Sequence, residues 1–147
     1  VFADLDQFVQ MVRNKSCEGQ ILTMHATSNA WSYVGRDSDG KINEVIEKVE
    51  ISNEATVGVY GWSDTSLAKS AFNDTFKRDI RTNNEFYVAP TYNFLISQGW
   101  TVETSLVGNH GEAVHGLGIP SDLGSFLKIS EAEEIAKCLK KKLGITP

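Results

Sequence analysis

The sequence predicts an α/β fold with a mixed sheet flanked by helices. Segments with strand-like and helix-like patterns are interleaved along the 147 residues, which favours this class. Hydrophobic residues make up 41% of the chain and charged residues 22%, so the composition supports a globular core. No internal repeat or low-complexity linker interrupts the pattern, and the length suits one domain. We therefore expect residues 1–147 to form a single domain.

The first residues predict a strand, a helix and a second strand. The short apolar run Val1–Leu5 is typical of a buried strand that ends in polar residues. Apolar residues at helical spacing then predict a short helix over Gln7–Asn14. The stretch GQILTMHAT, Gly19–Thr27, is rich in Ile, Leu, Thr and Met and predicts a buried strand.

The middle of the chain predicts a hairpin, a strand and a helix. Residues Trp31–Lys48 read as two strands around a tight turn, which the pair Asp39-Gly40 signals. ATVGVYGW, Ala55–Trp62, is the most strand-like stretch of the sequence. A helix with one apolar face is expected next, and Asp64 is its expected N-cap.

The last third predicts three helices and one strand. The stretch Glu85–Gly99 starts near a turn and continues as a helix that the glycine ends. WTVETSLV, Trp100–Val107, predicts a strand, and a glycine-rich loop follows it. A short helix is expected after Pro120, and an amphipathic helix with a lysine-rich end is expected over Glu131–Leu143.

Composition narrows the classes of function. The 14 Lys and Arg residues against 19 Asp and Glu give a net charge of −5, and no basic cluster is present. This argues against nucleic-acid binding as the main task, although a small phosphate needs only one or two local cations. Cys17 and Cys138 lie far apart, which suggests neither a zinc site nor a disulfide framework. No apolar run approaches a membrane span, so we expect a cytoplasmic protein without membrane contact.

Three stretches together resemble the sugar-phosphate nucleotidyltransferases of the nucleotide-diphospho-sugar transferase superfamily. DLDQFV is similar to the family's Asp-Gln motif at a strand end. KINEVIEKVEISNEATVGVY is similar to its hairpin, Glu-Lys pair and Gly-x-Tyr strand. NNEFYVAPTYNFLISQGW with VHGLGIPSDLGSFL is similar to its Glu-Phe-Tyr-Val helix and closing signature. The match extends to about Leu127 and implies a partial Rossmann-like fold of the GT-A type.

The resemblance also implies that this chain corresponds to the C-terminal, sugar-phosphate-facing portion of such an enzyme. Family members carry a preceding nucleotide-binding half with a glycine-rich loop, which nothing in this sequence matches. A truncated reading frame, an engineered fragment and a natural remnant all remain open. The complete enzyme would take a nucleoside triphosphate and a sugar 1-phosphate, and the chain alone is expected to be inactive.

The implied cofactor is Mg²⁺, which binds one or two carboxylates together with phosphate oxygens and water. Asp6 matches the family's metal-binding and catalytic Asp, and Asp4 would assist from the same strand face. The alternative is that these acidic residues cap the next helix. Gly116 stands where the family has a second metal-binding Asp, with Glu112 or His115 as substitutes.

The resemblance assigns five residues to the sugar-phosphate site. Glu47 and Lys48 match the pair that holds the sugar phosphate, although Glu-Lys is also a common surface dipeptide. Gly58 would let a sugar ring approach the backbone, or it marks a bulge in a central strand. Glu85 and Tyr87 stand near the family's sugar site, and buried helix-start structure is their alternative role.

The aromatic residues Trp31 and Tyr33 precede the hairpin, where they would border the sugar pocket or belong to the core.

Two other functions stay open. The Asp-x-Asp of DLD also resembles a glycosyltransferase motif that binds a nucleotide sugar through Mn²⁺. Alternatively, the chain is a non-catalytic α/β domain. In either form we expect a homo-oligomer, since a sheet that lacks its neighbouring strands exposes surface prone to self-association.

Overall fold

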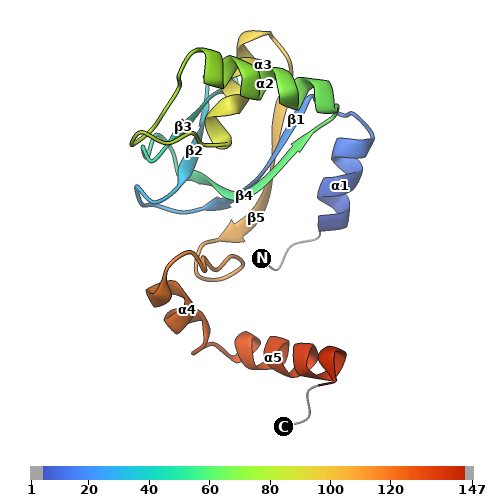
Figure 1. Cartoon of the computed structure of the whole chain (residues 1–147), viewed down its shortest axis with the longest axis vertical. Helices are drawn as coiled ribbons and strands as arrows, with labels where there is room; N and C mark the ends of the chain where they lie inside the picture. The colour runs from blue at the N-terminus through green and yellow to red at the C-terminus, as the bar shows by residue number, and fades with distance from the viewer. Residues whose placement is uncertain (1–4, 145–147) are drawn as a thin grey trace. The chain divides into compact units, whose positions relative to one another are not determined.

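A five-stranded mixed sheet organises the part of the chain that the structure describes, residues 5–144 of a computed structural model (Figure 1). The strand order is β3-β2-β4-β1-β5. Neighbouring strands pair antiparallel except β1 and β5, which are parallel. This confirms the predicted α/β class. The strands are β1 (Gly19–His25), β2 (Ser32–Arg36), β3 (Ile42–Glu47), β4 (Glu54–Trp62) and β5 (Val102–Asn109).

The predicted hairpin is present as β2 and β3, and its turn has the expected chemistry. Gly40 adopts φ 79°, a left-handed conformation that glycine tolerates. The Asp37 carboxylate accepts hydrogen bonds from the backbone N–H groups of Asp39 and Lys41, at 3.0 and 2.9 Å. These local bonds fix the turn, and the turn sets which residues of β2 and β3 face each other.

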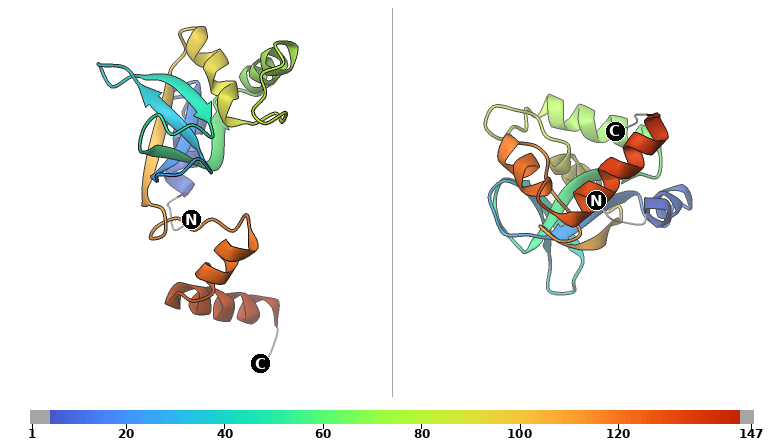
Figure 2. Two further views of the ribbon diagram at one scale, coloured as in Figure 1. Left: turned by 90° about the vertical axis from the view of Figure 1, so that its left-hand side faces the viewer. Right: turned by 90° about the horizontal axis from the view of Figure 1, so that it is seen from below.

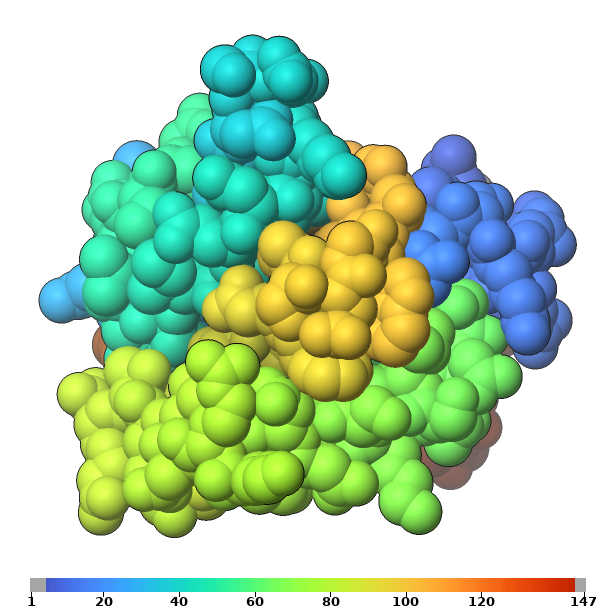
Figure 3. All heavy atoms as spheres, turned by 90° about the horizontal axis from the view of Figure 1, so that it is seen from above, coloured from blue at the N-terminus to red at the C-terminus, as the bar shows by residue number. Residues whose placement is uncertain are grey.

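Helices cover both faces of the sheet. Helix α2 (Thr65–Lys77), the short 3₁₀ helix η1 (Ala89–Thr91) and α3 (Tyr92–Ser97) lie over one face (Figure 2). In Figure 3, the gold residues around the end of α3 lie between the teal β2–β3 hairpin and the green α2. Asp64 caps α2 by accepting a hydrogen bond from the backbone N–H of Ser66 at 2.8 Å, as predicted.

The opposite face of the sheet is covered by α1 (Leu5–Arg13). The adjacent β4 residues Gly61 and Trp62 show which helices cover each face of the sheet, because neighbouring residues of a strand point to opposite faces. The ring of Trp62 stacks on Tyr92 of α3, with centroids 4.9 Å apart. A Cβ added at Gly61 would instead meet Val12 and Phe8 of α1, at 2.5 and 3.3 Å. The expectation of flanking helices is thus confirmed.

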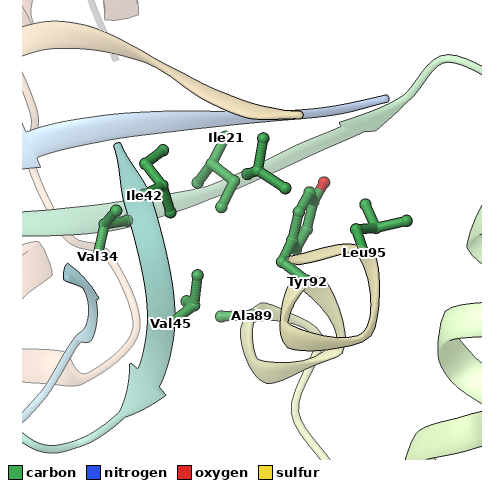
Figure 4. Close-up of a cluster of buried hydrophobic side chains, with 8 residues drawn as sticks. Ile21, Val34, Ile42, Val45, Ala89, Tyr92 and Leu95 are labelled. Carbon is green, nitrogen blue, oxygen red and sulfur yellow. The ribbon is translucent and has the colours of Figure 1, made fainter. Parts of the chain in front are cut away.

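The main apolar core lies between the sheet and α3 (Figure 4). Tyr92 and Leu95 are completely buried there, and their side chains fill the space above Gly19, where a Cβ would meet both at 2.8 Å. The Tyr92 hydroxyl donates to the Gly61 carbonyl at 2.9 Å and also lies 3.2 Å from that of Gln20. The buried members are Ile21, Val34, Ile42, Val45, Ala89, Tyr92, Leu95 and Val102.

The strand predicted over Val1–Leu5 is wrong at Leu5, the one residue of that range that the structure describes. Leu5 is the first residue of α1, and residues 1–4 lie outside the described residues. The apolar side chains Leu5, Phe8, Val9 and Val12 recur at helical spacing, so the amphipathic pattern extends back to Leu5. Asp6 consequently lies in the first helical turn, where a carboxylate suits the helix dipole.

The chain divides into two compact units, and the boundary in the sequence lies between Val114 and His115. Unit 1 contains the sheet and helices α1 to α3, and unit 2 contains α4 (Pro120–Phe126) and α5 (Ser130–Leu143). Both helices of unit 2 were predicted, and Gly144 ends α5 with φ 66°. Within residues 5–144, no helix combines the length and the apolar character that crossing a membrane requires.

Candidate functional site

A pocket of about 280 Å³ lies in unit 1, where the N-terminal end of β2 and the C-terminal end of β3 meet the middle of β4. Its other wall is the loop that leads into η1. Segments far apart in the sequence therefore meet around one pocket. Its lining consists of Ala30, Trp31, Ser32, Glu47, Thr56, Val57, Gly58, Tyr60, Tyr87, Val88 and Ala89.

The carboxylate of Glu47 is the buried charge of this pocket. Glu47 is the last residue of β3, and it is only 6% exposed. The hairpin register places it opposite Ser32, whose hydroxyl donates a hydrogen bond to the carboxylate. A carboxylate has several acceptor positions, so Glu47 can also accept hydrogen bonds from hydroxyl groups of a ligand.

Lys48 follows directly and is held in an unusual backbone conformation. Its φ is 59°, which is uncommon for a residue with a side chain. Its backbone N–H donates to the Trp31 carbonyl at 2.9 Å, and its Nζ donates to the Tyr87 hydroxyl at 2.6 Å. That hydrogen bond raises the pKa of Lys48, so the ammonium stays charged at neutral pH. Strained backbone of this kind occurs preferentially at functional sites.

Tyr87 connects Lys48 to Glu85. The Tyr87 hydroxyl donates to the Glu85 carboxylate at 2.6 Å, and the Lys48 ammonium lies 4.7 Å from the centre of the Tyr87 ring. A tight turn at Thr82–Glu85 precedes these residues, and the Arg81 guanidinium stacks on the Phe86 ring. Neither Glu85 nor Tyr87 is fully buried or helical, so buried helix-start structure does not describe them.

Gly58 lies in a bulge of β4 and also lines the pocket. Opposite β1, the pairing jumps from Ile21↔Tyr60 to Thr23↔Thr56, so β4 carries extra residues at this point. Gly58 has φ 82°, and a Cβ placed on it would meet no atom within 4 Å. The bulge expected as the alternative role of Gly58 is present, and its backbone faces open space; that a sugar ring approaches there stays a prediction.

Three polar residues of the pocket were not predicted from the sequence: Ser32, Thr56 and Tyr60. The Thr56 hydroxyl and the Tyr60 hydroxyl lie 2.9 Å apart. Burial raises the pKa of Tyr60, and the nearby Glu47 carboxylate adds to this, so the phenol stays protonated. Thr56 and Tyr60 lie two residues before and two residues after Gly58. Because residues at this spacing in a strand face the same side, the position of Gly58 could have indicated both of them.

The aromatic residues Trp31, just before β2, and Tyr33, within β2, have different positions. Trp31 lines the pocket, and its ring lies 5.2 Å from that of His110. Tyr33 points to the other side of the sheet, where it is completely buried in a second apolar cluster with Met24 and Ala55. Its hydroxyl bonds to the backbone of Ser28 at 2.6 and 2.7 Å.

The residues expected to bind metal are placed differently. Asp6 is exposed in the first turn of α1, and it is not among the described residues that line the pocket. Asp4 lies outside the described residues. The Glu112 carboxylate accepts a hydrogen bond from Asn109 at 2.8 Å, and the His115 ring lies 5.5 Å from that of Phe126. Within residues 5–144, no three acidic, His or Cys side chains form a metal-binding group.

The solved structures that are similar to this chain include the following two. A nucleoside-diphosphate-sugar pyrophosphorylase from Vibrio cholerae RC9 aligns over 88% of this chain and 50% of its own, with 23% identity and a TM-score of 0.70. A protein described as a glucose-1-phosphate thymidylyltransferase from Bacillus anthracis, in complex with a sucrose, aligns over 72% of this chain and 42% of its own. Its identity is 17% and its TM-score 0.51.

These similarities show a fold. The chain has the architecture of part of a sugar nucleotidyltransferase, and it spans about half the length of the structures that it matches. No protein-family model matches the sequence, and no curated protein does. The fold that the sequence motifs implied is therefore confirmed by structure, while the roles of the individual site residues stay predictions.

Proposed function

We propose that unit 1 binds a sugar 1-phosphate and is the acceptor-binding part of a sugar-phosphate nucleotidyltransferase. The observation that carries this proposal is that Glu47, Gly58 and Tyr87 line one pocket, and that the Lys48 ammonium donates a hydrogen bond to Tyr87 of that lining. These residues come from three separate stretches of sequence, and each matches a position that the sequence resemblance assigns to the sugar-phosphate site. The pocket offers hydrogen-bond acceptors and an open glycine backbone, and the Lys48 ammonium is held by the lining residue Tyr87, which together suit a phosphorylated sugar.

In the proposed complex, Lys48 contacts the phosphate and Glu47 orients the sugar. The ammonium forms a charge-assisted hydrogen bond with a phosphate oxygen. The buried Glu47 carboxylate and the hydroxyl groups of Thr56 and Tyr60 bond to sugar hydroxyls. Lys48 then holds the phosphate oxygen that attacks the α-phosphorus of a nucleoside triphosphate, with pyrophosphate as the leaving group. Positioning and charge stabilisation account for most catalysis of this kind.

The proposed cofactor is Mg²⁺, for which Asp6 is the candidate ligand. One exposed carboxylate is too few to hold the ion alone, so Asp6 would bind Mg²⁺ only together with substrate phosphates, through which Mg²⁺ is mainly bound. The ion would offset charge on the triphosphate. No observation among the described residues favours the Asp-x-Asp glycosyltransferase alternative, since Asp4 lies outside them and Asp6 lies on a helix.

The test is calorimetric titration of the chain with α-D-glucose 1-phosphate and, separately, with glucose. Replacing Lys48 with Ala removes the phosphate contact, so the Kd for glucose 1-phosphate should rise by roughly ten- to a hundredfold. The Kd for glucose should change little. Glu47→Gln should instead weaken binding of both ligands.

Lys41→Ala is the matched control, because it removes the same charge from an exposed position in the hairpin turn. It should leave both affinities unchanged. If the wild-type chain binds neither ligand, binding of glucose 1-phosphate is refuted and the non-catalytic alternative is favoured. If Lys41→Ala and Lys48→Ala weaken binding equally, the effect is one of net charge, and the assignment of Lys48 is wrong.

A further inference from the structure

Unit 2 is unusually apolar on its surface. It supplies six of the twelve exposed large hydrophobic side chains among the described residues, although it comprises only residues 115–144 of them. Exposed apolar side chains that gather in one segment mark an interaction surface. The six are Leu117, Ile119, Leu123, Leu127, Leu139 and Leu143.

Helix α5 has an apolar stripe and a separation of charge along its axis, and together these two patterns indicate which partner binds to it. Its exposed apolar residues Ala136, Leu139 and Leu143 recur at spacings of three and four, which forms one stripe along the helix. Its charges are separated by sign along the axis. Glu131, Glu133 and Glu134 lie in its first half, and Lys137, Lys140, Lys141 and Lys142 lie in its second half.

We propose that α5 pairs antiparallel with α5 of a second copy of this chain. In that arrangement the acidic half of each helix lies along the basic half of the other. A parallel pair would instead place like charges side by side. The antiparallel arrangement thus follows from the charge pattern, and the partner is the chain itself because the pattern is self-complementary.

The apolar stripe gives the same register as the charges. When Ala136 lies opposite the partner's Leu139, the two-fold axis repeats this contact, and small side chains meet large ones. This fits antiparallel coiled-coil packing, in which the two seam positions of the heptad face each other. In the same register Glu133 flanks the partner's Lys140. Glu134 and Lys141 point away from the contact.

The pair should be weak. A helix of 14 residues is about 21 Å long, so the contact is smaller than a standard protein interface. Exposed Leu123 and Leu127 of α4 belong to the same unit and can extend the apolar contact. We therefore expect a dimer that dissociates on dilution. This inference does not depend on the proposed function, because it uses no residue of the pocket.

The first experiment is sedimentation velocity over a range of concentrations. The wild-type chain should show a concentration-dependent dimer, and Leu139→Gln should shift it to monomer. Leu106→Gln is the matched control, because Leu106 is also 51% exposed but lies on the edge strand β5. If Leu106→Gln abolishes the dimer and Leu139→Gln does not, the sheet edge mediates association and the proposal is wrong. A wild-type monomer at every concentration also overturns it.

Charge exchange tests the antiparallel register. Glu133→Lys should weaken the dimer at least several-fold, as should Lys140→Glu, because each places like charges together. The double variant should restore the affinity. The control exchange, Glu134→Lys with Lys141→Glu, alters the helix ends similarly but should not change dimerisation. Circular dichroism checks that every variant keeps its helix content. Failure of the double variant to recover, with helix content intact, contradicts the register.

Cys138 provides an independent distance. It is exposed on α5 away from the apolar stripe, whereas Cys17 is buried, so a spin label attaches selectively to Cys138. Paired helices are 8–10 Å apart, so two labels near the two-fold axis should give one narrow distance distribution below about 35 Å. A broad distribution, or no dipolar signal at concentrations where dimer is present, would contradict pairing through α5.

Discussion

At the scale of single residues, the pocket combines a backbone conformation and a side-chain network that depend on each other. Lys48 keeps a φ of 59° because its backbone N–H bonds to Trp31 and its ammonium bonds to Tyr87. The left-handed conformation costs about 1–2 kcal/mol for a residue with a side chain, so these bonds must offset it. The direction of the Lys48 side chain is therefore set by the fold before any ligand arrives.

Gly58 offers a prediction that separates stability from binding. Gly58→Ala should lower the free energy of unfolding by about 1–2 kcal/mol, because φ 82° strains any residue with a Cβ, although space is free around it. Gly40→Ala is the control, since Gly40 has φ 79° and equally free surroundings in the hairpin turn. Urea unfolding should show similar losses for both. Only Gly58→Ala should also weaken binding of glucose 1-phosphate, and equal binding in both variants would remove Gly58 from the site.

The lowered pKa of Glu54 makes the stability of the fold depend on pH. Burial alone would raise the pKa of Glu54, but hydrogen bonds from Arg36, Thr104 and Thr23 and the Arg36 charge lower it overall. Arg36 approaches both carboxylate oxygens, at 3.0 and 3.2 Å. A depressed folded-state pKa stabilises the protein above the unfolded value of about 4.3, and this contribution disappears as the pH falls through the folded-state pKa.

Between pH 6 and pH 3.5, the wild-type chain should therefore lose more stability than Glu54→Gln does. Urea midpoints at the two pH values measure this difference. Equal losses would show that the Arg36–Glu54 pair contributes nothing to acid sensitivity.

At the scale of secondary-structure elements, Tyr92 is one of the side chains that attach α3 to the sheet, and Asn93 is another, through two hydrogen bonds to the Val45 backbone. The Tyr92 hydroxyl donates to the Gly61 carbonyl on β4, and its ring stacks on Trp62. Tyr92→Phe keeps the ring and should lower the free energy of unfolding by about 1 kcal/mol, through loss of the hydrogen bond. Tyr92→Leu also removes the stacked ring and should cost more. Denaturant unfolding with unchanged m-values measures both, and an unaltered midpoint for Tyr92→Phe would contradict this role.

Elements that local chemistry determines could be predicted from the sequence. The β2–β3 turn, the Asp64 cap and Gly99 after α3, with φ 74°, were all identified because each signal lies within a few residues. The beginning of α1 was missed because Leu5 fits both a strand that ends there and a helix that starts there. Ser32 and Tyr60 were missed because their position in the pocket depends on strand register and on the β4 bulge, which are non-local.

At the scale of the whole molecule, the pocket and the proposed dimer contact belong to different units. The lining of the pocket falls entirely within residues 30–89 of unit 1, whereas α5 belongs to unit 2. Substitutions in α5 should therefore leave sugar-phosphate binding unchanged at concentrations where the chain is monomeric. All residues that line the pocket belong to unit 1: they come from β2 and the two residues before it, from β3 and β4, and from η1 and the loop before it.

This separation leads to a prediction about activity. The chain spans about half of the nucleotidyltransferase structures that it matches, and its pocket supplies groups suited to the sugar phosphate. We expect glucose 1-phosphate to bind with the same Kd with and without Mg²⁺ and a nucleoside triphosphate. Pyrophosphate release should stay at the background rate, because Asp6 is the only proposed metal ligand among residues 5–144, and one carboxylate is too few to bind Mg²⁺ tightly. A coupled pyrophosphate assay measures turnover, and calorimetry measures both affinities. Pyrophosphate release above background that Asp6→Asn abolishes would show that this chain also binds the nucleotide productively.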